Sequence, residues 1–263
     1  MGTLEKAVPI ATLVFVVSSM VAMRFPLLTE DVPSGWFNEG DPITMEQPTV
    51  DQLVVAPKKL ASITQISSEL AEDSDPAAAS LVRDSLARSA ARTLDRAFFA
   101  SQSDPKGPAG ILSVAYQSVS AGSAFSTFDP FLAAATRLEK VGATATSFTA
   151  NADTVLGLSE LKEFSGSIQS NKSLLQPDPS QPTKRAINGV PLYSVADTVA
   201  LADNHIWCPD KTRTFVVIRR NIQIDVSPHA AFQSDSIMVR LTMRAAPAFP
   251  HPQACVLVTT GGS

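Results

Sequence analysis

Residues 75–102 read DPAAASLVRDSLARSAARTLDRAFFASQ, and the strongest helix signal of the chain lies here. Asp75 can accept a hydrogen bond as an N-cap, and Pro76 suits the first helical position. Neither glycine nor a further proline follows before Gln102. The stretch therefore predicts a single helix over residues 76–102, about 40 Å long at a rise of ~1.5 Å per residue.

Side chains along this helix divide into an apolar face and a charged face. Successive residues lie about 100° apart around a helix. On that spacing the apolar face carries Val82, Leu86, Ala90, Thr93, Leu94 and Ala97. The charged face opposite carries Asp84, Arg88, Arg92, Asp95 and Arg96. This division alone is typical of any amphipathic helix on a protein surface. The fold must therefore be inferred from the segments on either side of the helix.

The segments on either side of the helix follow a definite order. Residues 58–73, KKLASITQISSELAED, supply a strand and a Ser-x-Glu-Leu-x-x-Asp turn before the helix. Residues 101–112, SQSDPKGPAGIL, supply a polar exit that ends in Pro-x-Gly-Ile-Leu. Strand, turn, helix and exit in this order resemble the region around the spine helix of tailed-phage major capsid proteins of the Hong Kong 97 type. The resemblance implies the α+β fold of that family.

Residues 35–43, GWFNEGDPI, resemble a segment that the same family places on its E loop. The resemblance implies that residues 27–57 form a long two-stranded hairpin that reaches over a neighbouring subunit. About 30 residues with little periodicity cannot build a core of their own, so the physical pattern agrees. A disordered linker is the alternative. On this loop the expected subunit-interface residues are Trp36, Phe37, Glu39, Val50 and Val54.

The middle of the chain, residues 108–227, resembles the A domain of the family. Asp129 and Pro130 give a second start signal, which predicts a helix that ends at Gly142. The other elements expected here are a strand over 143–150, a short helix over about 153–162, a surface turn over 174–179 and the start of a strand at 188–192.

The C-terminal third predicts strands. Residues 214–218 form a continuous apolar run that Arg219 and Arg220 should end. An alternating pattern typical of a strand with one buried face follows at Ile222, Ile224 and Val226. A last short strand is expected over 254–259, after a longer strand that the prolines at 247, 250 and 252 should end.

That longer strand carries a second match to the family. Phe232, Asp235, Arg240 and Arg244 resemble a pattern on the long strand of its P domain. Two arginines four residues apart lie on one face of a strand and point to acidic partners, such as carboxylates of an adjacent subunit. A solvated strand face is the alternative. The expected subunit-interface residues of the P domain are Arg88, Arg92, Asp235, Arg240 and Arg244.

The resemblance implies a complete domain layout. It comprises an N-terminal arm (1–26), the E loop (27–57), the P domain with its spine helix (58–107), the A domain (108–227), the long P-domain strand (228–256) and a C-terminal strand returning to the A domain (257–263). Family members often carry an N-terminal scaffolding segment. None precedes the arm in this sequence, so we expect either a short natural form or a separate scaffolding protein.

The function that the resemblance implies is assembly into a virus shell. Copies of the chain would form hexamers and pentamers of an icosahedral head around packaged double-stranded DNA, without sequence-specific DNA binding. A portal protein, and decoration or scaffolding proteins, would be further partners. The location would be the virion, after assembly in the host cytoplasm. The alternative is an encapsulin-like compartment that encloses enzymes, but residues 1–25 lack the amphipathic helix on which encapsulins dock cargo.

Residues 8–23 form an uncharged apolar run that suggests a second alternative, a secreted or membrane-anchored protein. Glu5 lies beside Lys6 ahead of the run, and no clear small-x-small cleavage site follows it. The run is also rich in β-branched valines. We therefore expect a buried extended segment and no membrane partner.

Composition and motifs exclude several other classes. The 263 residues are 44% hydrophobic and 17% charged, and the net charge of −4 gives no electrostatic case for nucleic-acid affinity. Cys208 and Cys255 are too few for a disulfide scaffold, and the spacing of His205 and Cys208 is taken as incidental. No nucleophile elbow, phosphate-binding loop or His-Glu-x-x-His motif occurs. We expect no catalytic residue, no metal and no cofactor, and hence no enzyme.

The sequence lacks the residues that cross-link subunits in the namesake of the family. The namesake of the family joins an E-loop lysine to a P-domain asparagine of a neighbour, with a glutamate as base. Here residues 27–57 contain no lysine, the position nearest the asparagine is Asp235, and no glutamate follows Glu163. We therefore predict a shell without covalent cross-links.

Overall fold

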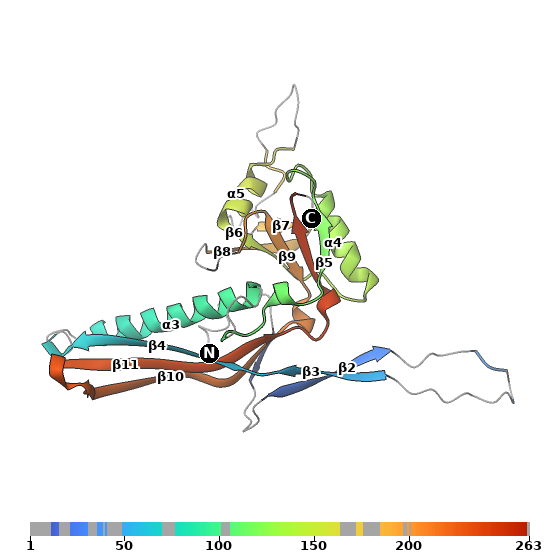
Figure 1. Ribbon diagram of the computed structural model, residues 1–263. Coiled ribbons are helices and arrows are strands. Elements are labelled where there is room, and N and C mark those ends of the chain that lie inside the picture. The colour runs from blue at the N-terminus through green and yellow to red at the C-terminus, as the bar shows by residue number, and fades with distance from the viewer. Residues whose placement is uncertain are drawn as a thin grey trace.

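A long four-stranded sheet with one long helix on it forms the lower part of the molecule in Figure 1. We call these five elements the platform: β1 (Thr12–Phe15), β4 (Lys58–Ser67), β10 (Phe215–Ala231), β11 (Ser236–Ala248) and α3 (Ala77–Phe99). The strand order is β1-β10-β11-β4; β11 is antiparallel to both neighbours, and β1 is parallel to β10. The structure is a computed structural model and describes residues 12–15, 22–30, 36–38, 40, 49–69, 77–100, 106–163, 172–175, 185–196, 199 and 201–261.

Helix α3 buries most of the apolar face that its sequence predicts. Leu86, Ala90 and Leu94 are buried in one core with Leu241 and Met243 of β11. Because β11 is an inner strand of the sheet, these contacts fix the helix over the middle of the platform. The described helix covers positions 77–99 of the predicted 76–102; residues 76, 101 and 102 lie outside the described part.

Two residues of α3 differ from their predicted faces. Thr93 is exposed although it was assigned to the apolar face, and Asp95 is half-buried although it was assigned to the charged face. The reason lies in the last turns, where Phe98 and Phe99 are both buried and form an edge-to-face pair. Two adjacent buried aromatics turn the buried arc of the helix away from Thr93 and toward Asp95.

A six-stranded sheet with two helices stands above the platform, and we call it the upper domain (Figure 1). Its elements are β5 (Gln117–Ser120), α4 (Asp129–Lys140), β6 (Phe148–Asn151), α5 (Ala152–Glu160), β7 (Arg185–Ile187), β8 (Val190–Val195), β9 (His205–Pro209) and β12 (Cys255–Thr259). The strand order is β5-β12-β9-β6-β8-β7. A core that includes Phe131, Phe148 and Ile206 joins α4 to this sheet.

Most predicted elements of the upper domain are present with altered bounds. The predicted helix from Asp129 is α4, the predicted short helix is α5, and the predicted final strand is β12. The predicted strand over 143–150 is shorter, since β6 begins only at Phe148. At the predicted strand start, Asn188 and Gly189 both have positive φ (51° and 83°) and form the tight turn between β7 and β8. Of the predicted surface turn, Leu175 is buried, and residues 176–179 lie outside the described part.

An antiparallel hairpin of β2 (Met23–Glu30) and β3 (Thr49–Val55) projects from one end of the platform (Figure 1). Its base packs on the platform through Val55 and Phe25, and the Phe25 ring stacks on that of Phe215 at a centroid distance of 5.5 Å. The predicted two-stranded hairpin is therefore present, although β2 begins four residues before position 27. The free turn between β10 and β11 lies at the opposite end of the platform (Figure 1).

Strand β10 corrects two predictions. The strand was expected to end at Arg219 and Arg220, yet it continues for 17 residues to Ala231. Irregularities in the β10–β11 register on both sides of Arg220 allow the strand to pass through these charged residues. All of β10 pairs within the platform, so the predicted boundary at residue 227 falls inside a platform strand. In the same way β11 passes through Pro247 and ends at Ala248, and β12 belongs to the upper sheet from Cys255 on.

The apolar run over 8–23 contains β1, which is extended and pairs with β10 from Thr12 to Phe15. This agrees with the predicted extended segment at those four positions; residues 8–11 and 16–21 lie outside the described part. None of the helices in the described ranges is both long enough and apolar enough to cross a membrane.

Candidate subunit-interaction surfaces

The hairpin exposes large apolar side chains along its length. Trp36 is fully exposed and Phe37 is 47% exposed, and on β3 Val50 and Val54 are 63% and 52% exposed. Four large apolar groups on one projecting element are unusual for an isolated surface and are typical of an interaction surface. Glu39, the fifth residue predicted on this loop, lies outside the described part.

Two of the predicted arginines lie on the platform face that α3 does not cover. Along β11, Leu241 and Met243 point to the core under α3, so the alternating Arg240 and Arg244 point to the open face. Arg240 donates from Nη2 to Oδ2 of Asp225 on β10 at 2.9 Å, and both side chains are more than half exposed. The open face is thus charged and accessible.

Arg88 and Arg92 belong to a different surface. Both are exposed on α3, which lies on the opposite side of the sheet from Arg240 and Arg244. Neither Arg88 nor Arg92 forms an ion pair with another residue of the described part, and this includes the Asp84–Arg88 pair that the spacing suggests. The predicted P-domain residues therefore do not form one patch.

Asp235 lies in a turn and not on a strand, which corrects its predicted position. It has φ 42° and ψ 60°, the left-handed conformation, at the end of the short 3-10 helix η4 (Phe232–Ser234) between β10 and β11. Its carbonyl oxygen accepts hydrogen bonds from the N–H of Ser68 at 3.0 Å and from the Ser68 hydroxyl at 2.9 Å. Aspartate tolerates the left-handed conformation better than most residues do. Asp235 therefore suits the tight turn at the tip of the platform.

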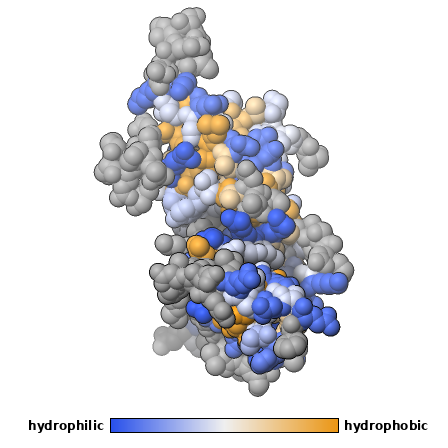
Figure 2. Space-filling model, turned by 90° about the vertical axis from the view of Figure 1, so that its left-hand side faces the viewer, coloured by the Kyte–Doolittle hydropathy of each residue, from blue (hydrophilic) through white to orange (hydrophobic). Residues whose placement is uncertain are grey.

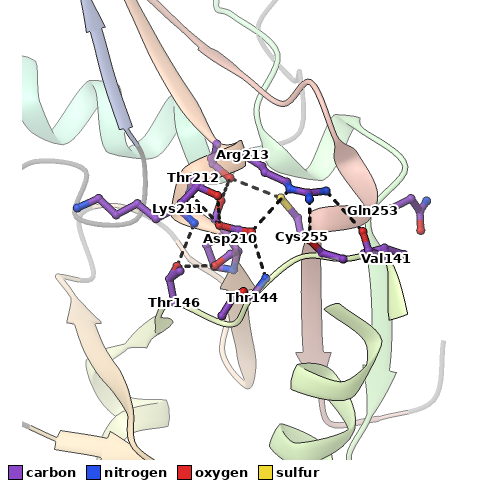
Figure 3. Close-up of polar contacts among 12 residues, drawn as sticks. Val141, Thr144, Thr146, Asp210, Lys211, Thr212, Arg213, Gln253 and Cys255 are labelled. Atoms are coloured by element: carbon purple, nitrogen blue, oxygen red, sulfur yellow. Dashed lines mark hydrogen bonds and ion pairs between the residues drawn. The ribbon is translucent and has the colours of Figure 1, made fainter. Parts of the chain in front are cut away.

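A polar cluster that the sequence did not predict lies where the chain passes from the upper domain into β10 (Figure 3). Asp210, only 3% exposed, accepts hydrogen bonds from the Thr144 N–H (3.1 Å), the Thr212 N–H (2.8 Å) and the Thr212 hydroxyl (2.7 Å). Burial acts to raise the pKa of Asp210, but these hydrogen bonds and the nearby Arg213 charge outweigh it and lower the pKa below 3.8. Asp210 is therefore an ionised structural carboxylate.

Arg213 extends this cluster to the end of α4. Its Nη2 donates to the carbonyl oxygen of Gly142 at 2.6 Å, which satisfies a free carbonyl beyond the helix C-terminus. Its Nε lies 3.9 Å from Oδ2 of Asp210. The cluster thus ties α4, the end of β9 and the start of β10 together.

The two cysteines near this cluster are buried free thiols. Burial raises the pKa of both Cys208 and Cys255 to about 12, so neither is a reactive thiolate. His205 and Cys208 point to opposite faces of β9, since they are three positions apart on one strand. Within the described ranges no group of three or more His, Cys, Asp or Glu residues could hold a metal ion.

Seen from the free end of the platform, the described surface is mainly hydrophilic, with apolar side chains showing between the polar ones mostly in the upper part (Figure 2). Single large apolar side chains are also exposed on the platform, at Ile63 (61%), Leu81 (63%) and Val226 (53%), but the exposed aromatics Trp36 and Phe37 belong to the hairpin. A partner could therefore bind at two surfaces: the exposed aromatic residues of the hairpin and the charged open face of the platform.

Three solved structures share this fold although their sequences have diverged. The capsid of an empty GTA particle matches with a TM-score of 0.79 at 18% identity, over 98% of this chain and 90% of that chain. Structures from Microbacterium phage Oxtober96 and Mycobacterium phage Bobi give TM-scores of 0.77 and 0.75, each at 15% identity. They cover 97% and 98% of this chain, and 90% of theirs in both cases.

No curated protein matches the chain in sequence. The profile of the phage capsid family matches residues 1–260, which is nearly the whole chain. This match and the capsid neighbours do not favour the encapsulin alternative. The chain belongs to the phage capsid family, has the Hong Kong 97-type fold, and is a structural protein of a capsid and not an enzyme.

Proposed function

We propose that this chain is the major capsid protein of a tailed double-stranded DNA phage. Copies of it form hexamers and pentamers, and these close into an icosahedral shell around packaged DNA. The observation that carries the proposal is the projecting β2–β3 hairpin with its fully exposed Trp36. A two-stranded hairpin with exposed apolar side chains is marginally stable alone and gains stability by packing on another molecule.

The geometry of the platform supports a head-to-tail contact. The hairpin leaves one end, and the β10–β11 turn with Asp235 lies at the other (Figure 1). A contact between two different surfaces of the same chain is heterologous, and such contacts close into rings when the rotation between copies is suitable. We propose that the hairpin of one copy lies over the platform of the next.

The residues that we propose for contacts between copies belong to the hairpin segment and to both faces of the platform. On the hairpin side we propose Trp36, Phe37, Glu39, Val50 and Val54. On the platform side we propose Arg88, Arg92, Asp235, Arg240 and Arg244. In family terms the hairpin is the E loop, the platform is the P domain with α3 as its spine helix, and the upper domain is the A domain, with the boundary moved to the start of β10 at Phe215.

The resemblance supplies the remaining partners. A portal, and scaffolding or decoration proteins, would complete the particle, and the head would form in the host cytoplasm before release as a virion. Since the shell has no need to read DNA sequence, contacts with the enclosed DNA would be limited to its phosphates.

Examination of the purified chain by negative-stain electron microscopy and mass photometry tests the proposal. We expect closed shells with five- and six-fold units, and nuclease-protected double-stranded DNA in particles released by the native phage. The paired substitution Trp36→Ser and Phe37→Ser should abolish shells while the subunit stays folded. A wild-type chain that remains monomeric at high concentration would contradict the proposal.

A further inference from the structure

Three cations lie side by side across the open face of the platform. In the strand register Arg220 of β10 is paired with Arg244 of β11, and Arg244 is paired with Lys59 of β4. Directly paired residues in adjacent strands have Cβ atoms about 4.5–5.5 Å apart. All three side chains are exposed and line one hollow of about 170 Å³ together with Arg240 and Asp225. We call Lys59, Arg244 and Arg220 the cation row.

The cation row has no balancing charge within the described part of the chain. The hollow contains four cations and one carboxylate, a formal charge of +3. That carboxylate, Asp225, is already paired with Arg240 at 2.9 Å. None of the ion pairs between described residues involves Lys59, Arg220 or Arg244. Like charges placed directly opposite in a sheet destabilise it, so the row is a site that an anion would stabilise.

The chain itself carries a matching set of anions in the hairpin segment, residues 27–57. This segment contains six carboxylates and no Lys, Arg or His; the six are Glu30, Asp31, Glu39, Asp41, Glu46 and Asp51. Its formal charge is −6, whereas the whole chain has −4, so the rest of the chain has −4 − (−6) = +2. The acidic character of the protein is therefore concentrated in the element that projects from it.

The strands of the hairpin, β2 and β3, lead away from the cation row of their own copy. Lys59 follows the base of the hairpin closely, whereas in the sequence five of the six acids fall between the last residue of β2 and the first residue of β3. With eight residues in β2 at about 3.3 Å each, that point is roughly 26 Å from the base. In Figure 1 the hairpin runs away from the platform strands. The hairpin of a second copy can therefore bring its carboxylates to the cation row, whereas the hairpin of the same copy leads away from it.

We propose that the cation row Lys59–Arg244–Arg220 is the docking site for carboxylates of residues 27–57 of a second copy of this chain. The inference rests on the proposed function and names the chemistry of that contact. Complementary charges of this kind fix the register of two partners and suppress wrong ones, and they act over about 10 Å at 0.1 M salt. Docking across three strands would also orient the hairpin across the platform and not along it.

Reversal of the central charge tests the proposal. Arg244→Glu should reduce the yield of shells at least tenfold at 50 mM NaCl while the thermal unfolding temperature of the subunit stays the same or rises, because the repulsion within the row is removed. Lys140→Glu, the same charge change on the exposed end of α4, is the matched control and should assemble normally. If Arg244→Glu assembles as well as the wild type, the proposal is wrong.

A compensating reversal then identifies the partner. Each of the six acids is changed to Lys in the Arg244→Glu background, and at least one of the double variants should recover assembly that both of its single variants lack. Failure of all six to restore any assembly would exclude the hairpin as the occupant. If instead Arg244→Glu leaves assembly of DNA-free protein intact and weakens binding of a 30-base-pair duplex, the row serves phosphates, and the proposal is likewise excluded.

A measurement that needs no shell separates this inference from the proposed function. A fluorescent peptide of residues 27–57, which carries all six carboxylates, is titrated with the full chain. Arg244→Glu should weaken its binding at least tenfold at 50 mM NaCl, with a smaller difference at 500 mM. A wild-type chain that forms no shells but binds the peptide in this manner would refute the shell and support the cation row. Equal binding by both variants, or none, would refute the row even if shells form.

Discussion

The carboxylate of Asp210 accepts a hydrogen bond from the backbone N–H of Thr144 at 3.1 Å, across 66 positions of the chain. Asp210 follows β9 of the upper domain and precedes β10 of the platform, while Thr144 follows α4. The bond therefore holds the point at which the chain crosses between the two parts. Since Arg213 links the same carboxylate to the end of α4, loss of Asp210 removes several contacts at once.

Asp210→Ala should lower the free energy of unfolding by about 2–4 kcal/mol. The change leaves the N–H groups of Thr144 and Thr212 without their acceptor in a buried site, and each such loss costs about 1–3 kcal/mol. Urea denaturation of the subunit measures this difference. Glu163→Gln, which removes an exposed ion pair with Lys172, is the control and should change stability by less than about 1 kcal/mol.

Ionisation of the Asp210 carboxylate should make the stability of the fold depend on pH. Because the pKa of Asp210 is lower in the folded state than the ordinary 3.8, its ionised form stabilises the fold. That contribution is fully present above about pH 4 and is lost as the pH falls through the lowered pKa. The stability difference between the wild type and Asp210→Asn should be constant from pH 5 to 8 and shrink below pH 4. A difference that persists unchanged at pH 2 would contradict this assignment.

Alanine substitution should have opposite effects on stability at Gly110 and at Gly157. A Cβ at Gly110 would lie 2.2 Å from the carbonyl oxygen of Ala100 and 2.3 Å from that of Ala97, at the end of α3. Gly110→Ala should therefore cost about 2 kcal/mol or more. A Cβ at Gly157, within α5, would meet nothing within 4 Å, so Gly157→Ala should stabilise by about 0.5–1 kcal/mol. Denaturation curves showing equal effects of both changes would contradict the close approach at Gly110.

The two faces of α3 predict opposite outcomes for single substitutions. Leu86 is 8% exposed in the platform core, so Leu86→Asp should prevent folding, because an unpaired buried charge costs several kcal/mol (about 3–5). Arg88 is exposed, and Arg88→Ala should leave the subunit folded. Circular dichroism of the purified variants distinguishes the two cases. Soluble, folded Leu86→Asp protein would show that the buried face is assigned wrongly.

Elements with strong local signals could be predicted from the sequence. The Asp-Pro start and regular apolar spacing identified α3 and α4, and alternation identified the strand that contains Ile222 and Ile224. The match of the exit motif also has a physical basis in the structure, since Gly110 lies against the last carbonyls of α3 and Ile111 is fully buried. Such signals depend on residues close together in the sequence.

Features that depend on pairing between distant segments could not be predicted. Local sequence ends the strand at Arg219 and Arg220, because the irregular strand register that accommodates them leaves no signal in neighbouring residues. The Asp210 cluster joins residues 66 positions apart, and its only local sign is the Asp-x-Thr spacing of a turn. The residues of the cation row are far apart in the sequence and become neighbours only when β4, β11 and β10 pair. Arg240 and Arg244 were identified, but Lys59 and Arg220 were not.

Asp95 is a carboxylate that should destabilise the fold at neutral pH. Burial raises its pKa from 3.8 to about 7, and its Oδ1 has no hydrogen-bond partner in the described structure. A raised folded-state pKa means that the protonated form is favoured on folding, so stability falls as the pH rises from about 4 to 7. Asp95→Asn should therefore raise the unfolding temperature at pH 8 and change it little at pH 4. Thermal denaturation at the two pH values measures this, and an equal shift at both would contradict a titrating Asp95.

The absence of covalent cross-links is the prediction that most separates this shell from the namesake of its family. An isopeptide bond needs a deprotonated lysine amine as the nucleophile. Residues 27–57 contain none, and the nearest lysines, Lys58 and Lys59, begin β4 within the platform. Asp235, at the position nearest the asparagine of the namesake, forms a turn through its backbone and carries no amide. No glutamate follows Glu163 that could act as the base.

Non-covalent contacts must then hold the mature shell, and they should be sensitive to denaturants. Exposed Trp36 and Phe37 offer apolar area to a neighbour, and the acidic hairpin segment offers charge. Mature particles boiled in detergent with reductant should therefore run on electrophoresis as a single band near 27.9 kDa. Reductant matters little to this result, since Cys208 and Cys255 are both buried and free. A ladder of multimers that survives boiling would show that another pair of residues supplies the cross-link, and Lys59 would be the first to replace with arginine.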